Sequence, residues 1–141
     1  MDKELLAEHY IQEGNCCTAA ILRAAMELKG CGQQEDLVQA ASGLCGGIHA
    51  GQNCGALTGG AMMLSLFDRA AAASMMIPEL VEWFDGEYGM EYGSINCEDI
   101  AGPDRRHKAE RCRPLINAVY RKCLELLEEY LSDAGRLPGE W

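Results

Sequence analysis

Apolar residues recur every three or four positions along almost the whole chain. The pattern is clearest from about Arg113 to Asp133, where the apolar positions are Leu115, Ile116, Val119, Tyr120, Cys123, Leu126, Leu127, Tyr130 and Leu131. This spacing places apolar side chains on one face of an α-helix, whereas a half-buried strand alternates apolar and polar residues. No segment alternates convincingly, so we expect an all-α fold.

The same spacing, together with capping residues, predicts further helices. They cover a short first segment that ends near Gly14, then about 15–30, 35–44, 54–69, a segment from about Ser74, and 96–101. The segment 54–69 is apolar nearly all round and contains glycines, which is typical of a helix buried among others. We therefore predict one domain, 1–141, built as a compact bundle of about five to seven helices around this central helix. A short extended tail is expected from about residue 134.

The composition argues against several classes of protein. The formal net charge is −10 over 141 residues, whereas a general nucleic-acid binder needs a surface that neutralises phosphates. The first five residues have no basic start followed by an apolar stretch, and the most apolar segment, 56–67, is too short to cross a bilayer. We expect a cytoplasmic domain with no nucleic-acid partner and no membrane span.

Four of the eight cysteines stand where a helix is expected to begin. Cys16, Cys54 and Cys97 each follow an asparagine, which is a common N-cap residue. Cys112 lies two residues before Pro114, and proline is favoured in a first helical turn. The N–H groups and partial positive charge of a helix start favour a thiolate and lower a cysteine pKa. In a reducing compartment, such cysteines point to metal binding or catalysis rather than to structural disulfides.

The other four cysteines have different surroundings. Cys123 lies on the apolar face of the last helix, and Cys31 follows a helix end, so we expect a core residue and an exposed thiol. Cys17 and Cys45 lie close to candidate site residues, and their roles stay open. The helix-start cysteines are 38, 43 and 15 residues apart, which matches neither a zinc finger nor a C-x-x-C redox motif. Four unrelated small residues at helix starts are the alternative interpretation.

Two further features favour a site near these cysteines, although each has a structural alternative. Gly55 and Gly59 are one turn apart in the expected central helix, where they admit either a cluster or a tightly packed neighbouring helix. Around Cys112 lie seven of the 12 basic residues, namely Arg105, Arg106, Lys108, Arg111, Arg113, Arg121 and Lys122. This basic patch either stabilises a thiolate or an anionic cluster, or is solvated surface. His49 and His107 each precede a candidate cysteine by five residues and are candidate thiolate partners or polar surface.

The order of the cysteines and their flanks resembles a known family. The segments concerned are Asn15-Cys16 with Thr18-Ala19-Ala20-Ile21-Leu22, residues 42–48, Cys54-Gly55-Ala56-Leu57-Thr58-Gly59-Gly60-Ala61-Met62, residues 93–97, and Cys112. Together they resemble the C-GCAxxG-C-C family of redox-active proteins over about residues 8–130. The chain has Cys54-Gly55-Ala56 where the family name writes Gly-Cys-Ala. The resemblance implies a small helical redox module, with an iron–sulfur cluster on its cysteines as one proposal.

Three hypotheses of function follow. The first is electron transfer through an iron–sulfur cluster, [2Fe–2S] or [4Fe–4S], with four thiolate ligands from Cys16, Cys54, Cys97 and Cys112. The second is metal-free thiol–disulfide chemistry, in which Cys54 attacks an oxidised partner and another of these four cysteines resolves the mixed disulfide. The third is a structural zinc or assembly module, with a homodimer as one form. No sequence feature identifies the redox partner.

Overall fold

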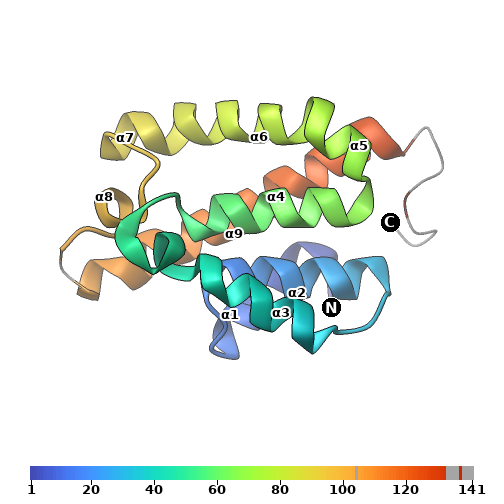
Figure 1. Ribbon diagram of the computed structural model, residues 1–141, viewed down its shortest axis with the longest axis horizontal. Coiled ribbons are helices and arrows are strands. Elements are labelled where there is room, and N and C mark those ends of the chain that lie inside the picture. The colour runs from blue at the N-terminus through green and yellow to red at the C-terminus, as the bar shows by residue number, and fades with distance from the viewer. Residues whose placement is uncertain (104, 133–136, 138–141) are drawn as a thin grey trace.

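The helices lie in three tiers in the computed structural model, which describes residues 1–103, 105–132 and 137 and leaves out the side chains of 105–109. The lower tier in Figure 1 contains α1 (Leu6–Gln12), α2 (Cys17–Lys29) and α3 (Glu35–Ala41). The middle tier contains α4 (Gly55–Phe67), with α9 (Arg105–Leu131) passing behind it. Because α4 packs against α2, α6 and α9, it is the central helix of the bundle.

The upper tier is one nearly continuous helical run. It consists of α5 (Arg69–Ala71), the wide turn η4 (Ala72–Met76), α6 (Ile77–Phe84), the wide turn η5 (Asp85–Gly89) and α7 (Met90–Tyr92). The short helix α8 (Cys97–Ala101) follows at one end of the molecule. Three short helical turns are the remaining elements among the described residues: η1 (Lys3–Leu5), η2 (Ser42–Leu44) and η3 (Gly47–Gly51).

This architecture confirms the predicted all-α bundle around a glycine-containing central helix. The described residues contain no strand, only an isolated bridge between Asn53 and Asn96. They also contain no helix with the length and apolar character needed to cross a membrane. The predicted extended tail falls outside the described residues except for Leu137, which packs against the core.

Two helix boundaries differ from the prediction. The upper run begins at Arg69 rather than near Ser74, because the Asp68 carboxylate accepts a hydrogen bond from the N–H of Ala71 at 2.9 Å and so caps the helix. The last helix begins at Arg105, eight residues before the predicted start, so Pro114 lies inside it. Residues 105–112 are mostly Arg, Lys, Ala and Glu, whose helix propensity extends the helix past the proline.

Two glycines of α4 allow its neighbours to pack closely. A Cβ atom on Gly59 would lie 3.1 Å from the Cα of Thr18 in α2. A Cβ atom on Gly60 would lie 2.9 Å from methyl groups of both Leu80 in α6 and Val119 in α9. The tight-packing interpretation of the glycines therefore holds for these two positions.

We expect Gly60→Ala to lower the free energy of unfolding by about 1–3 kcal/mol, because Leu80 and Val119 are fully buried and cannot move aside freely. Gly86→Ala is the matched control, since its Cβ atom meets nothing within 4 Å and its backbone is helical. That control should raise stability by about 0.4–1 kcal/mol. Urea denaturation of the two variants tests the difference, and equal effects would contradict it.

Stability should also fall in alkaline solution. Burial raises the pKa of the Cys123 thiol and of the Tyr120 hydroxyl, so both stay protonated in the folded protein while the unfolded chain ionises near pH 8.5 and 10. The unfolded state then binds fewer protons, and the free energy of unfolding decreases as the pH rises above about 8.5. Denaturation at about pH 7, 8.5 and 10 should show a shallower decline for Cys123→Ala than for the exposed control Cys31→Ala.

Candidate redox site

Six of the eight cysteines line one cavity of about 530 Å³. They are Cys16, Cys17, Cys45, Cys54, Cys97 and Cys112. Apolar residues of α1, α8 and α9 complete much of the wall, among them Ile11, Ile100 and Ile116. The structure thus brings all four predicted site cysteines together with Cys17 and Cys45. Cys31 is exposed beyond the end of α2, and Cys123 is buried in the core with its sulfur 3.7 Å from the carbonyl oxygen of Gly60.

Helix starts position three of the predicted cysteines. Cys16 is the N-cap of α2, Cys54 is the N-cap of α4, and Cys97 is the first residue of α8. Two backbone hydrogen bonds join the last two segments: the N–H of Cys54 donates to Ile95 at 3.0 Å, and the N–H of Cys97 donates to Gln52 at 2.6 Å. The fold therefore brings the start of α8 beside the start of α4.

Cys112 departs from this pattern. It lies inside α9, in the turn before Pro114, rather than at a helix start. It reaches the cavity because it lies on the face of α9 that lines it. The partial positive charge of a helix N-terminus is confined to the first turn and does not act on Cys112. The predicted placement at a helix start therefore holds for Cys16, Cys54 and Cys97 and is wrong for Cys112.

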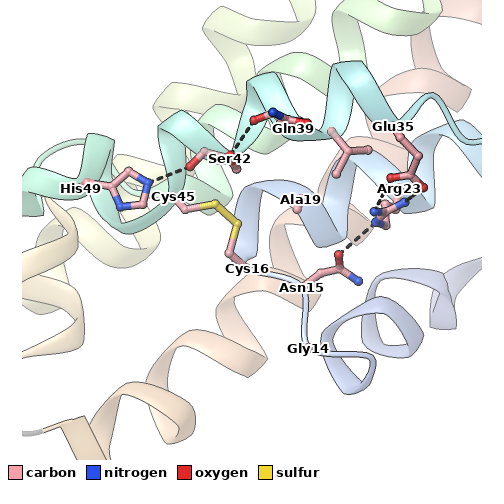
Figure 2. A pocket seen from close by; sticks show the side chains of 11 residues that line it. Gly14, Asn15, Cys16, Ala19, Arg23, Glu35, Gln39, Ser42, Cys45 and His49 are labelled. Atoms are coloured by element: carbon pink, nitrogen blue, oxygen red, sulfur yellow. Dashed lines mark hydrogen bonds and ion pairs between the residues drawn. A yellow bond between two sulfur atoms is a disulfide. The ribbon is translucent and has the colours of Figure 1, made fainter.

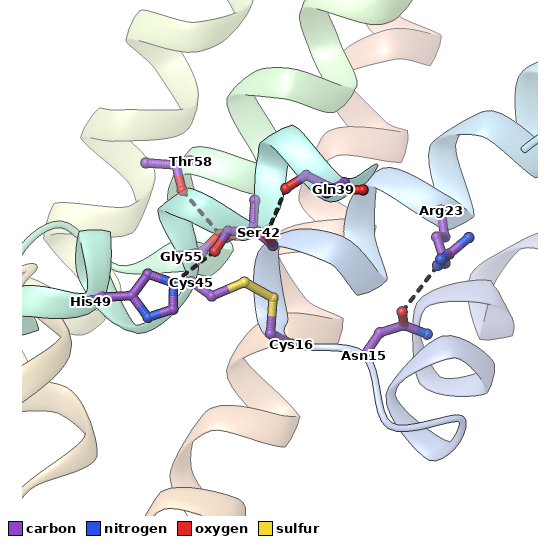
Figure 3. Close-up of a disulfide and its surroundings, with 10 residues drawn as sticks. Asn15, Cys16, Arg23, Gln39, Ser42, Cys45, His49, Gly55 and Thr58 are labelled. Carbon is purple, nitrogen blue, oxygen red and sulfur yellow. Dashed lines mark hydrogen bonds between the residues drawn. A yellow bond between two sulfur atoms is a disulfide. The ribbon is translucent and has the colours of Figure 1, made fainter. Parts of the chain in front are cut away.

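Cys16 and Cys45 form a disulfide, with their Cα atoms 6.1 Å apart (Figures 2 and 3). This separation is within the usual range for a disulfide. Sequence reasoning placed Cys45 near the site but did not identify its partner. The pairing joins residues that are 29 positions apart, and it depends on how α3 packs against α2, which local patterns do not encode.

A left-handed turn follows Cys45 and returns the chain toward α4. Residues Gly46, Gly47, Ile48 and His49 all have positive φ angles, between 52° and 65°. For Ile48 and His49 this conformation is unfavourable by about 1–2 kcal/mol per residue. Gly47 is required here, because a Cβ atom would lie 2.4 Å from the backbone oxygen of Gln52. The His49 Nε2 donates a hydrogen bond to the carbonyl oxygen of Ser42 at 2.8 Å, which closes the turn beside the disulfide (Figure 3).

Burial decides the protonation of Cys54. The N–H groups of Ala56 and Leu57 at the start of α4 act to lower its pKa, as the helix-start argument predicts. Desolvation is the larger effect, because the residue is only 6 % exposed. Together with unfavourable electrostatic interactions with Cys17 and Cys112, it raises the pKa of Cys54 to about 12. The expected low pKa is therefore wrong for this cysteine.

The lack of a side chain at Gly55 leaves room for the sulfur of Cys17. A Cβ atom on Gly55 would lie 2.4 Å from the Cys17 Sγ and 2.8 Å from the Thr18 Oγ1. The Thr18 hydroxyl donates to the carbonyl oxygen of Gly55 at 2.8 Å. The Thr58 hydroxyl donates to the same oxygen at 3.1 Å, as Figure 3 shows. At this position the glycine leaves room for side chains of the neighbouring helix α2, and the approach of a metal cluster stays a prediction.

The basic patch contributes one described side chain to the cavity wall. Arg113 lines the cavity and pairs with the carboxylate of Glu8. Arg111 donates to the carbonyl oxygen of Ile100 at 3.3 Å and lies 5.6 Å from the ring centre of Tyr92. Lys122 lies 3.6 Å from Glu125. The side chains of Arg105, Arg106, His107 and Lys108 fall outside the described residues, so the predicted roles of these four stay untested.

The predicted metal ligands do not form a ligand set in this geometry. Among the described residues, no group of three or more His, Cys, Asp or Glu side chains is arranged to hold a metal ion. Cys16 is bonded to Cys45, whereas a cluster ligand must be a thiolate. The cavity brings the four sulfurs near one another, but a cluster would require the disulfide to open and the sulfurs to converge.

The chain belongs to the family described as "Putative redox-active protein (C_GCAxxG_C_C)", whose model matches residues 15–126. The match includes every cysteine of the cavity. No curated protein and no solved structure matches the chain. Redox activity is therefore the function that the family describes.

We expect Cys54 to alkylate slowly, with a rate that increases about tenfold per pH unit between about pH 8 and 10, because only the thiolate reacts. The exposed Cys31 is the internal control. Mass spectrometry of iodoacetamide-treated native protein would measure both sites. A Cys54 rate near pH 7 equal to that of Cys31 would contradict the protonation assigned here.

Proposed function

We propose that the protein is a thiol–disulfide redox protein whose reversible couple is Cys16–Cys45. One observation carries this proposal: the disulfide lies on the wall of a cavity that four more cysteines line. A disulfide with only a structural role needs no neighbouring thiols, whereas exchange chemistry requires sulfur atoms near one another. Membership of a family described as redox-active supports the same class of chemistry.

The two cysteines of the couple have different surroundings. Cys16 is half-buried and caps α2, where unpaired N–H groups stabilise a thiolate, while Cys45 is only 8 % exposed and follows the turn η2. We therefore assign Cys16 as the attacking cysteine and Cys45 as the resolving one, in place of Cys54. The Cys16 thiolate attacks a partner disulfide, and one partner sulfur leaves as a thiolate. Cys45 then attacks Cys16, which re-forms the disulfide and releases the second partner sulfur, so that two electrons and two protons reach the partner.

Electron transfer through an iron–sulfur cluster on Cys16, Cys54, Cys97 and Cys112 is the alternative. The four cysteines of the family motif face one cavity, which favours a shared role. The measurement that separates the hypotheses is the iron, sulfide and zinc content of anaerobically purified protein. Stoichiometric iron and sulfide would replace the proposal with the cluster, and stoichiometric zinc would favour the structural module. Light scattering of the same sample would test the predicted homodimer.

Replacement of Cys45 by serine distinguishes the two kinds of chemistry most sharply, because Cys45 is essential to the disulfide and is not one of the four predicted cluster ligands. We expect Cys16→Ser and Cys45→Ser each to abolish a two-electron couple that otherwise follows about 30 mV per tenfold change in redox ratio. Cys31→Ser should leave it unchanged. Thiol trapping after equilibration in glutathione buffers provides the titration. A two-electron titration of the Cys16 thiol that survives Cys45→Ser would overturn the assignment.

A further inference from the structure

The Cys16–Cys45 disulfide separates two cavities. On its inner side lies the cavity lined by the four other cysteines. On its outer side lies a second hollow of about 510 Å³ between α2 and α3, which polar residues such as Arg23, Glu35 and Ser42 line (Figure 2). Cys16 and Cys45 line both hollows. The same disulfide therefore faces a polar groove on one side and a set of thiols on the other.

Cys17 lines the same cavity as this disulfide and Cys54. The point where a Cβ atom of Gly55 would lie is 2.4 Å from the Cys17 Sγ and 3.3 Å from the carbonyl oxygen of Leu44. Leu44 directly precedes Cys45, and Gly55 directly follows Cys54. The Cys17 sulfur thus lies beside the residue that follows Cys54, and the residue that precedes Cys45 approaches the same point. The buried hydrogen bond from Thr18 to Gly55 fixes this arrangement.

We propose that Cys17 and Cys54 form a second, inner couple, which takes over the disulfide from Cys16–Cys45. This inference rests on the proposed function. In the first step the Cys17 thiolate attacks the Cys45 sulfur, the Cys17–Cys45 bond forms, the Cys16–Cys45 bond breaks, and Cys16 takes up the proton that Cys17 lost. In the second step the Cys54 thiol attacks Cys17 as its proton passes to the departing Cys45 sulfur, so that the Cys17–Cys54 bond forms, the Cys17–Cys45 bond breaks and Cys45 leaves as a thiol.

The exchange is balanced within the chain. Two electrons pass from the inner couple to the outer couple, the number of disulfides stays at one, and no other oxidant or reductant takes part. The outer couple is then reduced and can be oxidised again by the disulfide of a partner that reaches it from the polar groove. The inner couple would therefore double the number of electrons that one chain can exchange, from two to four.

The experiment uses full-length protein that carries one disulfide per chain. After incubation without oxidant, samples are quenched with acid, alkylated and mapped by mass spectrometry. We expect a fraction of the Cys16–Cys45 disulfide to be replaced by Cys17–Cys54 at constant total disulfide. On full oxidation the wild type should lose four thiols in two steps, whereas Cys17→Ser and Cys54→Ser should each lose only two. Cys31→Ser is the control and should behave as the wild type.

Two results would overturn the inner couple while leaving the proposed function intact. One is a disulfide that stays at Cys16–Cys45 at all times in a chain whose outer couple titrates reversibly. The other is transfer to Cys97 or Cys112 in place of Cys17. Failure of Cys16–Cys45 to form or reduce reversibly would instead overturn the proposed function itself. The mapping of the wild type needs no substitution, so the test holds even if a variant does not fold.

Discussion

The close contact between the starts of α2 and α4 is the constraint on which the site depends. Glycine at positions 55 and 59 lets the backbone of α2 approach α4, and the buried Thr18 hydroxyl donates to the Gly55 carbonyl across the contact. This contact holds Cys16 and Cys17 at the end of one helix next to Cys54 at the end of the other. A larger residue at Gly55 would separate the two helix starts, and the cysteines of the cavity would move apart with them.

Two opposing electrostatic effects differentiate the cysteines. A helix start favours a thiolate, and burial in an apolar cavity disfavours it. At Cys54 burial outweighs the N–H groups of α4, so the thiol stays protonated near neutral pH. Cys16 caps an equally long helix but is only half-buried, so the same helix-start effect acts there with less opposition. In the proposed mechanism, degree of burial rather than position at a helix start distinguishes the role of Cys16 from that of Cys54.

Sequence periodicity was sufficient to predict the fold class, because apolar spacing and helix caps are local features of the sequence. It predicted the all-α bundle and the central helix 54–69, which the structure has as α4. The start of α9 was misplaced because Pro114 is tolerated inside a helix whose preceding residues favour helix formation. The Cys16–Cys45 pairing and the burial of Cys54 were not predictable in the same way. Both depend on tertiary contacts between segments that are far apart in the sequence.

The adjacent cysteines Cys16 and Cys17 have a mechanical consequence. Cys16 has an extended backbone and Cys17 begins the helix, and a single planar peptide unit joins the two. A movement of the start of α2 therefore shifts both side chains. In the proposed exchange the Cys17–Cys45 bond forms as the Cys16–Cys45 bond breaks, so both neighbouring sulfurs must reach Cys45 at the same moment. The start of α2 therefore has to carry the attacking sulfur and the departing sulfur together.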